Sequence, residues 1–360
     1  MCSTGEHPRR FTAGGAQGEV DHLWHAAGVR TRVRAAGLLL GYLADVSLGD
    51  PRRGHPVAGF GSVAAHLERV TYRDSRAAGA LHVAALLGTL GAVATLAARA
   101  ADRRGAVTSA AAVAAATWVS LGGESLARTG LAMAELLEAG DVDGARALLP
   151  WLCGRDPAYL DADGLARAAL ESVAENTSDA QVAPMMWAAA GGAPAVLLYR
   201  GANTLDAMVG HPSPRYARFG WVAARLDDAA NYLAARLAGA LVAACAPAVG
   251  GSAGAVVRAW RRDAHRHPSP NAGVVEAAFA GALGVRLGGP TQYRHELQMR
   301  PTLGDGPPPG ANDLRRAVRL SRVVQAAAAA VAVLVTVALP RWAGRVSGAG
   351  RTGRRACPRQ

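Results

Sequence analysis

The sequence contains no lysine, since all 39 of its basic residues are arginine. This absence excludes a lysine nucleophile, a lysine Schiff base and the lysine of a P-loop. Aromatic residues make up only 5% of the chain, and no nucleic-acid recognition motif accompanies the arginines, so we expect no nucleic-acid partner. The four cysteines are scattered and form no CxxC pair, which argues against a zinc site and against a disulfide framework.

Charged residues are also scarce. They make up 18% of the chain, whereas a soluble domain carries about 25%. Hydrophobic residues reach 51% and the mean hydropathy is +0.11. A net charge of +12 in such a chain is typical of a membrane protein whose arginines face anionic lipid. The 360 residues leave room for one polytopic membrane domain.

Several apolar segments are long enough to cross a bilayer. Residues 77–98 and 106–122 are joined by a short turn rich in arginine, which predicts a helical hairpin. Residues 233–257 and 323–340 are also apolar. Residues 182–199 are interrupted by prolines and glycines. We expect this broken segment to be re-entrant or packed inside the bundle, because neighbours must satisfy the backbone groups that such breaks set free.

Polar segments set the expected domain boundaries. Residues 1–34 show no clear periodicity and are expected to be a disordered extension, and residues 341–360, with six arginines and no acid, a disordered tail. Residues 124–181 hold eleven acids against four arginines, which predicts a polar helical insertion in a catalytic domain over residues 35–340. The predicted fold class is therefore all-α, a polytopic membrane helical bundle with a polar helical insertion.

A row of carboxylates precedes the broken segment. Glu171, Glu175 and Asp179 are spaced four residues apart, so on a helix they share one face with neighbouring Cβ atoms about 6 Å apart. Like charges at that separation repel one another unless a cation lies between them, and Mg²⁺ often joins one or two carboxylates to a phosphate. The spacing alone favours a solvated acidic helix face, and the metal site is the alternative.

A second polar cluster follows the broken segment. Its members are Asn203, Thr204, Asp206, Arg225, Asp227, Asp228 and Asn231. Arg225 suits a phosphate or carboxylate clamp, because its guanidinium is a planar fork of donors, and it equally suits an ion pair with Asp228 or with a lipid phosphate. Because polar clusters bracket the broken segment on both sides, we expect both to belong to one site at the bilayer surface.

Two loops add further polar residues. The first is punctuated by proline and glycine and contains Asp45, Asp50, Arg52, Arg53 and His55. It is either part of the site or a proline-rich turn with an aspartate as helix N-cap. In the second, Ser269 or Asn271 precedes an apolar helix that carries Glu276 in its first or second turn.

These motifs together resemble one family. The runs ESVAENTSD, APMMWAAAGGAPAVLLYRGANTLDAMVGH and RYARFGWVAARLDDAANYLAAR are similar to those of the CobD/CbiB family, the adenosylcobinamide-phosphate synthases of cobalamin biosynthesis. LADVSLGDPRRGHPVAGFG and SPNAGVVEAAFAGALGVRLGGP extend the likeness over about residues 35–340. The chain departs from the family pattern at Arg200, where lysine is expected, at Ala180, where glycine is frequent, and at Val274–Val275, where Trp-Pro is common.

The resemblance implies a multi-pass enzyme of the cell membrane. Such an enzyme joins (R)-1-amino-2-propanol, or its O-phosphate, to a propionate carboxylate of adenosylcobyric acid, with ATP as co-substrate and Mg²⁺ as cofactor. The product is adenosylcobinamide or its phosphate. Membrane lipid and other late enzymes of the pathway are further implied partners. A corrinoid-binding or transport-like membrane protein without chemistry of its own is the alternative.

The resemblance and the residue chemistry together assign roles. ATP must activate the carboxylate as an acyl phosphate, which needs Mg²⁺ and cationic groups, and the amine must attack in its neutral form, which needs a base. We expect catalysis by Glu171, Glu175, Asp206 and Arg225. We expect metal binding by Asp179, Asp227 and Asp228. We expect substrate or phosphate binding by Asn176, Arg200, Asn203, Asn231, Asn271, His55 and Asp50.

Overall fold

The computed structural model describes residues 14–51, 54–211, 213–292 and 297–352, and these are almost entirely helical. The helices are α1 (Gly14–Leu48), α2 (Pro56–Thr71), α3 (Arg76–Arg104), α4 (Ala106–Ser120), α5 (Gly123–Glu138), α6 (Val142–Leu148), α7 (Ala162–Thr177), α8 (Ala183–Leu205), α9 (Trp221–Cys245), α10 (Ala253–Asp263), α11 (Ala272–Leu283) and α12 (Ala311–Thr352). An antiparallel hairpin of β1 (Leu287–Gln292) and β2 (Leu297–Leu303) precedes α12. The all-α class is confirmed, and the hairpin is an addition that the sequence did not predict.

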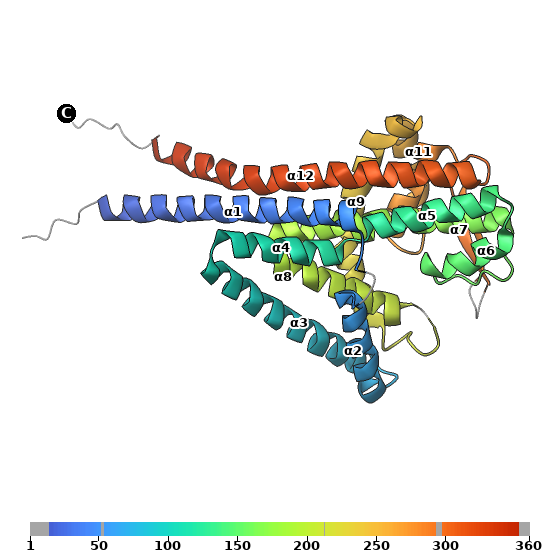
Figure 1. Cartoon of the computed structure of the whole chain (residues 1–360), viewed down its shortest axis with the longest axis horizontal. Helices are drawn as coiled ribbons and strands as arrows, with labels where there is room; N and C mark the ends of the chain where they lie inside the picture. The colour runs from blue at the N-terminus through green and yellow to red at the C-terminus, as the bar shows by residue number, and fades with distance from the viewer. Residues whose placement is uncertain (1–13, 52–53, 212, 293–296, 353–360) are drawn as a thin grey trace, which may run out of the picture.

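Five stretches of the described chain are long and apolar enough to cross a membrane. They are Arg76–Arg104, Ala106–Glu138, Ala162–Gly210, Trp221–Val249 and Ala311–Ala338. Figure 1 shows α1 and α12 running side by side along the length of the molecule, with α4 next to α1. The helices α3 and α4 form the predicted hairpin, and Gly105 between them has a φ of 115° that favours glycine.

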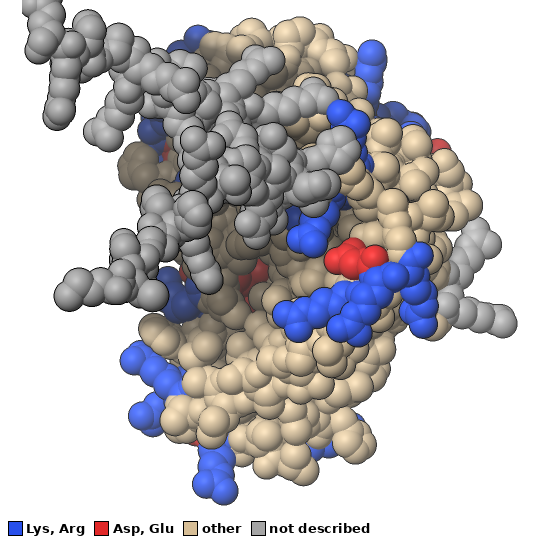
Figure 2. All heavy atoms as spheres, turned by 90° about the vertical axis from the view of Figure 1, so that its left-hand side faces the viewer, with Lys and Arg blue, Asp and Glu red and all other residues tan. Residues whose placement is uncertain are grey.

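One end of the molecule is basic. The N-terminal end of α1, the turn between α3 and α4 and the C-terminal end of α12 point toward this end (Figure 1). Figure 2 looks onto it and shows arginine side chains around the rim. The exposed arginines near this end include Arg30 and Arg32 of α1 and Arg99, Arg103 and Arg104 of α3. This arrangement suits contact with anionic headgroups.

The opposite end contains α5, α6, α7, α11 and the hairpin (Figure 1). The predicted polar insertion over residues 124–181 corresponds to α5, α6, α7 and the first π turn described below. It is more deeply packed than its charge suggests, because Leu165, Leu170 and Val173 of α7 are fully buried against α5, α11 and α12. The acids of this segment therefore divide between an outer surface and a buried interface.

The broken segment is a kinked helix inside the bundle. Gly192 has φ 66° and ψ −151°, which interrupts α8 two residues before Pro194. Arg34 of α1 donates to the carbonyl oxygens of Ala189 and Ala190 at 3.1 and 2.8 Å, groups that the kink leaves without helical partners. The expectation that neighbours satisfy the freed backbone is confirmed, and α8 packs between α3, α4 and α9.

Both ends of the described chain are helical. Residues 14–34 are the first part of α1, and residues 341–352 continue α12. Residues 1–13 and 353–360 lie outside the described residues.

The contact between α1 and α4 predicts which glycines tolerate a methyl group. A Cβ on Gly37 or Gly41 would overlap backbone carbonyl oxygens and side chains of α4, whereas a Cβ on Gly88 of α3 would meet open space. Small residues four apart let helix backbones approach closely. We expect Gly41→Ala to lower the unfolding free energy by about 1–3 kcal/mol. Gly88→Ala should be neutral or stabilising. Thermal unfolding of the detergent-solubilised protein measures both, and equal midpoints for the two variants would contradict the packing.

Candidate functional site

The two ends of α8 are wound as π-helical turns. Ser178–Val182 connects α7 to α8, and Asp206–Gly210 follows α8. A π turn re-aims the side chains around it, and such turns are frequent at functional sites. Asp179 lies in the first turn and Asp206 begins the second. Both predicted site residues therefore occur where the helix departs from regular α geometry.

The solvated acidic face expected from the four-residue spacing is not present. Glu171 is 1% exposed, whereas Glu175 is an exposed residue one turn later. The π turn then displaces Asp179 from the regular helical row. The three carboxylates consequently have different surroundings, and each takes part in a different set of contacts.

Helix α9 places Asp227 at the centre of an amide network. Asn203 Nδ2 donates to Asp227 Oδ1 at 3.2 Å, and Asn231 Nδ2 donates to Oδ2 at 3.0 Å. The Tyr199 hydroxyl lies 2.8 Å from Asn231 Oδ1 and 2.8 Å from the backbone oxygen of Asp179. These contacts join both flanks of α8, as the sequence predicts.

Several carboxylates gather along this network. Asp179, Asp206, Asp227 and Glu175 lie close enough to repel one another. Among the described residues, no three His, Cys, Asp or Glu side chains form a ready set of metal ligands. Mg²⁺ does not require such a set, because it commonly takes one or two carboxylates, several waters and substrate phosphates. Each carboxylate oxygen of Asp227 accepts from one asparagine amide and keeps further acceptor capacity.

A cavity of about 620 Å³ adjoins the network. Its lining includes Asp50, His55, Asn176 and Arg200, all predicted to bind substrate or phosphate. Arg200 Nη1 also donates to Asn203 Oδ1 at 3.2 Å, which links the cavity wall to the amide network. Asp50 Oδ1 and Arg200 Nε are buried and have no hydrogen-bond partner within the described part of the chain. Buried polar atoms without a hydrogen-bond partner are rare in folded proteins. A polar ligand in the cavity would supply the missing hydrogen bonds.

The loop before α2 positions His55 at this cavity. His55 is the N-cap of α2, and its Nδ1 accepts a hydrogen bond from the backbone N–H of Val57 at 3.2 Å. The expected aspartate N-cap is therefore wrong, and a histidine takes that position. Burial lowers the pKa of His55 below its usual value, so the imidazole is neutral at pH 7. Arg52 and Arg53 lie outside the described residues.

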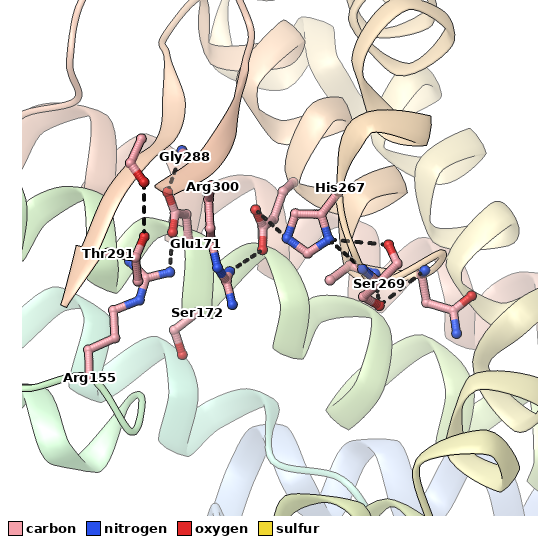
Figure 3. Close-up of polar contacts among 12 residues, drawn as sticks. Arg155, Glu171, Ser172, His267, Ser269, Gly288, Thr291 and Arg300 are labelled. Atoms are coloured by element: carbon pink, nitrogen blue, oxygen red, sulfur yellow. Dashed lines mark hydrogen bonds and ion pairs between the residues drawn. The ribbon is translucent and has the colours of Figure 1, made fainter. Parts of the chain in front are cut away.

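Glu171 is held in a buried ion pair (Figure 3). Arg155, from the turn before α7, donates through Nη2 to Glu171 Oε2. The backbone N–H of Gly288 in β1 donates to Oε1 at 2.7 Å. Both carboxylate oxygens are therefore occupied. The pair connects α7 to the hairpin and leaves Glu175 as the accessible glutamate of this helix.

A second buried group lies next to this ion pair (Figure 3). Glu276 Oε2 is 3.8 Å from His267 Nε2, and Glu276 Oε1 is 3.8 Å from Arg300 Nη1. His267 Nδ1 accepts a hydrogen bond from the backbone N–H of Ser269 at 3.0 Å. Burial and the nearby Arg300 charge lower the pKa of His267 to about 4. The imidazole is therefore neutral at pH 7, with its proton on Nε2 facing Glu276.

Arg225 and Asp228 lie on the outer side of α9, and Asn271 lies at the start of α11. Arg225 Nη1 pairs with Asp228 Oδ2 at 3.2 Å, and the Arg225 side chain is 64% exposed. The ion pair that the sequence allowed for Arg225 is thus present. Asn271 Nδ2 donates to the backbone oxygen of Asp228 at 2.8 Å, and Asn271 Oδ1 accepts from Arg236. These contacts join α9 to the start of α11. The Ser269 hydroxyl accepts hydrogen bonds from the backbone N–H groups of Asn271 and Ala272.

Four residues of the site were not singled out from the sequence. They are Arg155, Tyr199, His267 and Arg300. Their partners lie at distant positions in the chain, and no local motif identifies them. Tyr199 lies in the broken apolar segment. A buried tyrosine hydroxyl usually has a hydrogen-bond partner, so this residue could have been identified from the sequence.

The low pKa of His267 predicts acid sensitivity. The folded protein binds this proton near pH 4 and the unfolded chain near pH 6.5, so stability falls as pH falls through that interval. We expect His267 to lower the unfolding free energy by ~2 kcal/mol between pH 7 and pH 5. His267→Asn keeps an acceptor for the Ser269 N–H and cannot titrate. Unfolding midpoints at the two pH values should differ less in this variant than in the wild type, and an equal difference would contradict the assignment.

Comparisons with known proteins agree with this geometry. The sequence model of the family described as CobD/Cbib protein matches residues 38–321. The chain is 65% identical over 304 residues to "Cobalamin biosynthesis protein CobD" of Mycobacterium tuberculosis, covering 84% of this chain and 96% of that protein. It is 43% identical over 292 residues to the protein of the same name from Chromobacterium violaceum, covering 79% and 90%. No solved structure matches the chain.

The family match covers most of the chain and includes the residues around α8 that form the amide network, the carboxylate cluster and the cavity. The relatives carry a common name and are covered almost end to end. The chain belongs to the CobD/CbiB family of cobalamin biosynthesis proteins.

Proposed function

We propose that this protein is an ATP-dependent amide ligase of cobalamin biosynthesis. It joins (R)-1-amino-2-propanol, or its O-phosphate, to a propionate carboxylate of adenosylcobyric acid. The observation that supports this most is the cavity wall of Arg200 and Asn176 directly beside the carboxylates around Asp227. A cationic wall next to an acidic cluster suits a phosphoryl group held between an arginine and a metal ion.

The first step is activation of the propionate carboxylate. Its oxygen attacks the γ-phosphorus of ATP, the bond from that phosphorus to the bridging oxygen breaks, and ADP leaves. The Arg200 guanidinium stabilises charge on the transferring phosphoryl group, and its buried Nε is available for this. Mg²⁺, when bound by Asp179 and Asp227, neutralises phosphate charge and orients the phosphates. Asn203 and Asn231 fix the orientation of the Asp227 carboxylate.

The second step is attack of the amine on the acyl phosphate. The primary amine is an ammonium ion in water, so it must give up a proton before its lone pair is available. Glu175 is the accessible carboxylate on the α7 side of the cluster and accepts this proton. The new C–N bond forms as the C–O bond to phosphate breaks. Phosphate leaves with the second nitrogen proton, and the amide is neutral.

The cavity matches the reacting parts of the substrates. Its volume of about 620 Å³ lies within the ~300–1,000 Å³ of small-molecule sites, whereas a whole corrinoid is much larger. We therefore place the propionate arm and the transferring phosphate in the cavity. The corrinoid ring remains outside, against the surface near Trp151, which is 81% exposed and also lines the cavity.

The protein is proposed to be a multi-pass protein of the cell membrane. Its five apolar stretches support spanning, and the arginine-rich end supports contact with anionic lipid headgroups (Figure 2). An amphipathic corrinoid near the bilayer surface is accessible to neighbouring enzymes. Other late enzymes of the cobalamin pathway in the same membrane are therefore the proposed partners.

The carboxylate of Asp227 tests the metal assignment. Asp227→Asn keeps the size and hydrogen-bonding shape of the side chain but removes its charge. We expect kcat to fall by roughly 100-fold or more, because a metal ligand on the transferring phosphate is lost. Arg218→Ala is the surface control, since the exposed Arg218 pairs with the exposed Asp74 at 3.8 Å. ADP release and the mass of the amide product measure both. Unchanged turnover in Asp227→Asn would remove Asp227 from the metal site. If the wild type made neither ADP nor amide, the ligase assignment would be wrong, and the alternative of a corrinoid-binding or transport-like protein would be favoured.

Arg200 tests the phosphate assignment independently. Arg200→Gln should raise the KM for ATP by about 10-fold, since a buried charged contact to phosphate is lost. Arg200→Lys keeps the positive charge, although it loses the planar fork, and should restore most of the ATP affinity. Steady-state kinetics with ATP as the varied substrate distinguish the two. Equal KM values for Gln, Lys and the wild type would show that Arg200 does not contact the nucleotide.

A further inference from the structure

Three glutamates and two arginines meet where α7, α11 and the hairpin pack together. Glu171 and Glu175 come from α7, and Glu276 comes from α11. Arg155 and Arg300 lie among them. His267 is neutral at pH 7, because its pKa is about 4. With all three carboxylates ionised, the cluster would carry one more negative charge than positive charge.

The pairing within this cluster shows where that excess charge lies. Glu171 accepts from Arg155 and from the Gly288 N–H, so its oxygens are occupied. Glu276 shares its charge with Arg300 at 3.8 Å. Glu175 forms no hydrogen bond or ion pair with any other described residue, and it is exposed. Of the three glutamates, Glu175 is the one that a ligand can reach from solvent.

Glu276 adds an independent sign of a missing ligand. Its side chain is 1% exposed, and neither carboxylate oxygen has a hydrogen-bond partner in the described part of the chain. The contacts to His267 and Arg300 at 3.8 Å are too long for hydrogen bonds. A buried carboxylate without donors is strongly unfavourable, and this one interacts electrostatically with Glu175. A group with several N–H donors and one positive charge would satisfy both glutamates.

We propose that Glu175 and Glu276 form the subsite for the primary ammonium group of the amine substrate. A primary ammonium offers three donors and no acceptor, which matches the free oxygens of Glu276 together with the carboxylate of Glu175. Its single positive charge also brings the cluster to neutrality. This assignment rests on the proposed ligase function and specifies where the second substrate binds.

The subsite also orders the proton transfers. The ammonium gives one proton to the Glu175 carboxylate, which is open to solvent and can release it again. The neutral amine then attacks the acyl carbon, and the C–O bond to phosphate breaks with its electron pair on phosphate. The remaining nitrogen proton is transferred to that phosphate. Glu276, which is buried beside Arg300, holds the amine in position.

The ammonium group itself is the feature to vary. We compare binding of 1-amino-2-propanol O-phosphate with binding of its diol analogue, propane-1,2-diol 2-phosphate, by calorimetry on the purified full chain without ATP or corrinoid. The wild type should bind the amine at least 10-fold more tightly than the diol. Glu276→Gln and Glu175→Gln should each abolish this preference. Glu138→Gln, an exposed glutamate paired with Arg315 at 2.7 Å, is the matched control and should keep it.

Kinetics separate this subsite from the rest of the site. Glu276→Gln should raise the KM for the amine at least 10-fold and leave the KM for ATP unchanged, which also shows that the variant is folded. Glu276→Asp should restore part of the amine affinity. If Glu276→Gln fails to fold, the exposed Glu175→Gln still gives the binding comparison between the amine and the diol, which does not depend on turnover. An unchanged amine KM in a variant that still makes amide would overturn the subsite and leave the ligase standing.

Two further outcomes are decisive. Equal affinity of the wild type for the amine and the diol would overturn the ammonium assignment, because charge would play no part. Tight binding of MgCl₂ or KCl that is lost in Glu276→Gln, without any effect on amine binding, would assign the cluster to an inorganic cation instead. Absence of product from the wild type would contradict the ligase alone, since the binding comparison does not depend on turnover.

Discussion

Burial of carboxylates inside an apolar helical bundle is the constraint on which the rest of this structure depends. An ionised carboxylate away from water is costly unless donors or cations surround it. The chain meets this cost for Asp227 with two asparagine amides and for Glu171 with Arg155 and a backbone N–H. Among the described residues, it leaves the buried Glu276 carboxylate without a hydrogen-bond donor. Our proposal places the amine of the substrate at this position.

The irregular helix α8 brings these groups together. If α8 were a regular helix, the polar clusters at its two ends would lie far apart, on opposite sides of the bundle. The π turns at both ends and the kink at Gly192 redirect the chain, so that the Tyr199 hydroxyl contacts both flanks. Arg34 stabilises the kink from α1. The close contact of α1 with α4 through Gly37 and Gly41 places that arginine. Distant small residues thus help to build the site.

The sequence predicts those features that are local in the chain. Polar clusters on either side of a proline- and glycine-broken segment indicated one site, and the α8 network joins them. Asp50, His55, Asn176 and Arg200 were chosen from separate motifs, and they line one cavity. The helical hairpin of α3 and α4 followed from two apolar runs and a charged turn.

Features that depend on long-range packing were not predictable. Glu171 meets a backbone N–H that is 117 residues away in the sequence, and neither spacing nor composition indicates that pairing. The π turns have no sequence signature, so the carboxylate row was expected to continue as one helical face. The hairpin is short and contains Gly288, Gly289 and Pro290, which weakens a strand pattern.

The central claim is that ATP activates a carboxylate of the corrinoid by transferring its γ-phosphoryl group. Transfer of ¹⁸O from labelled adenosylcobyric acid to inorganic phosphate tests this most directly. An acyl phosphate places one carboxylate oxygen on the phosphorus, so the phosphate released during amide formation should contain one ¹⁸O atom per turnover. Amide formation with unlabelled phosphate, or with the label in AMP, would contradict the account.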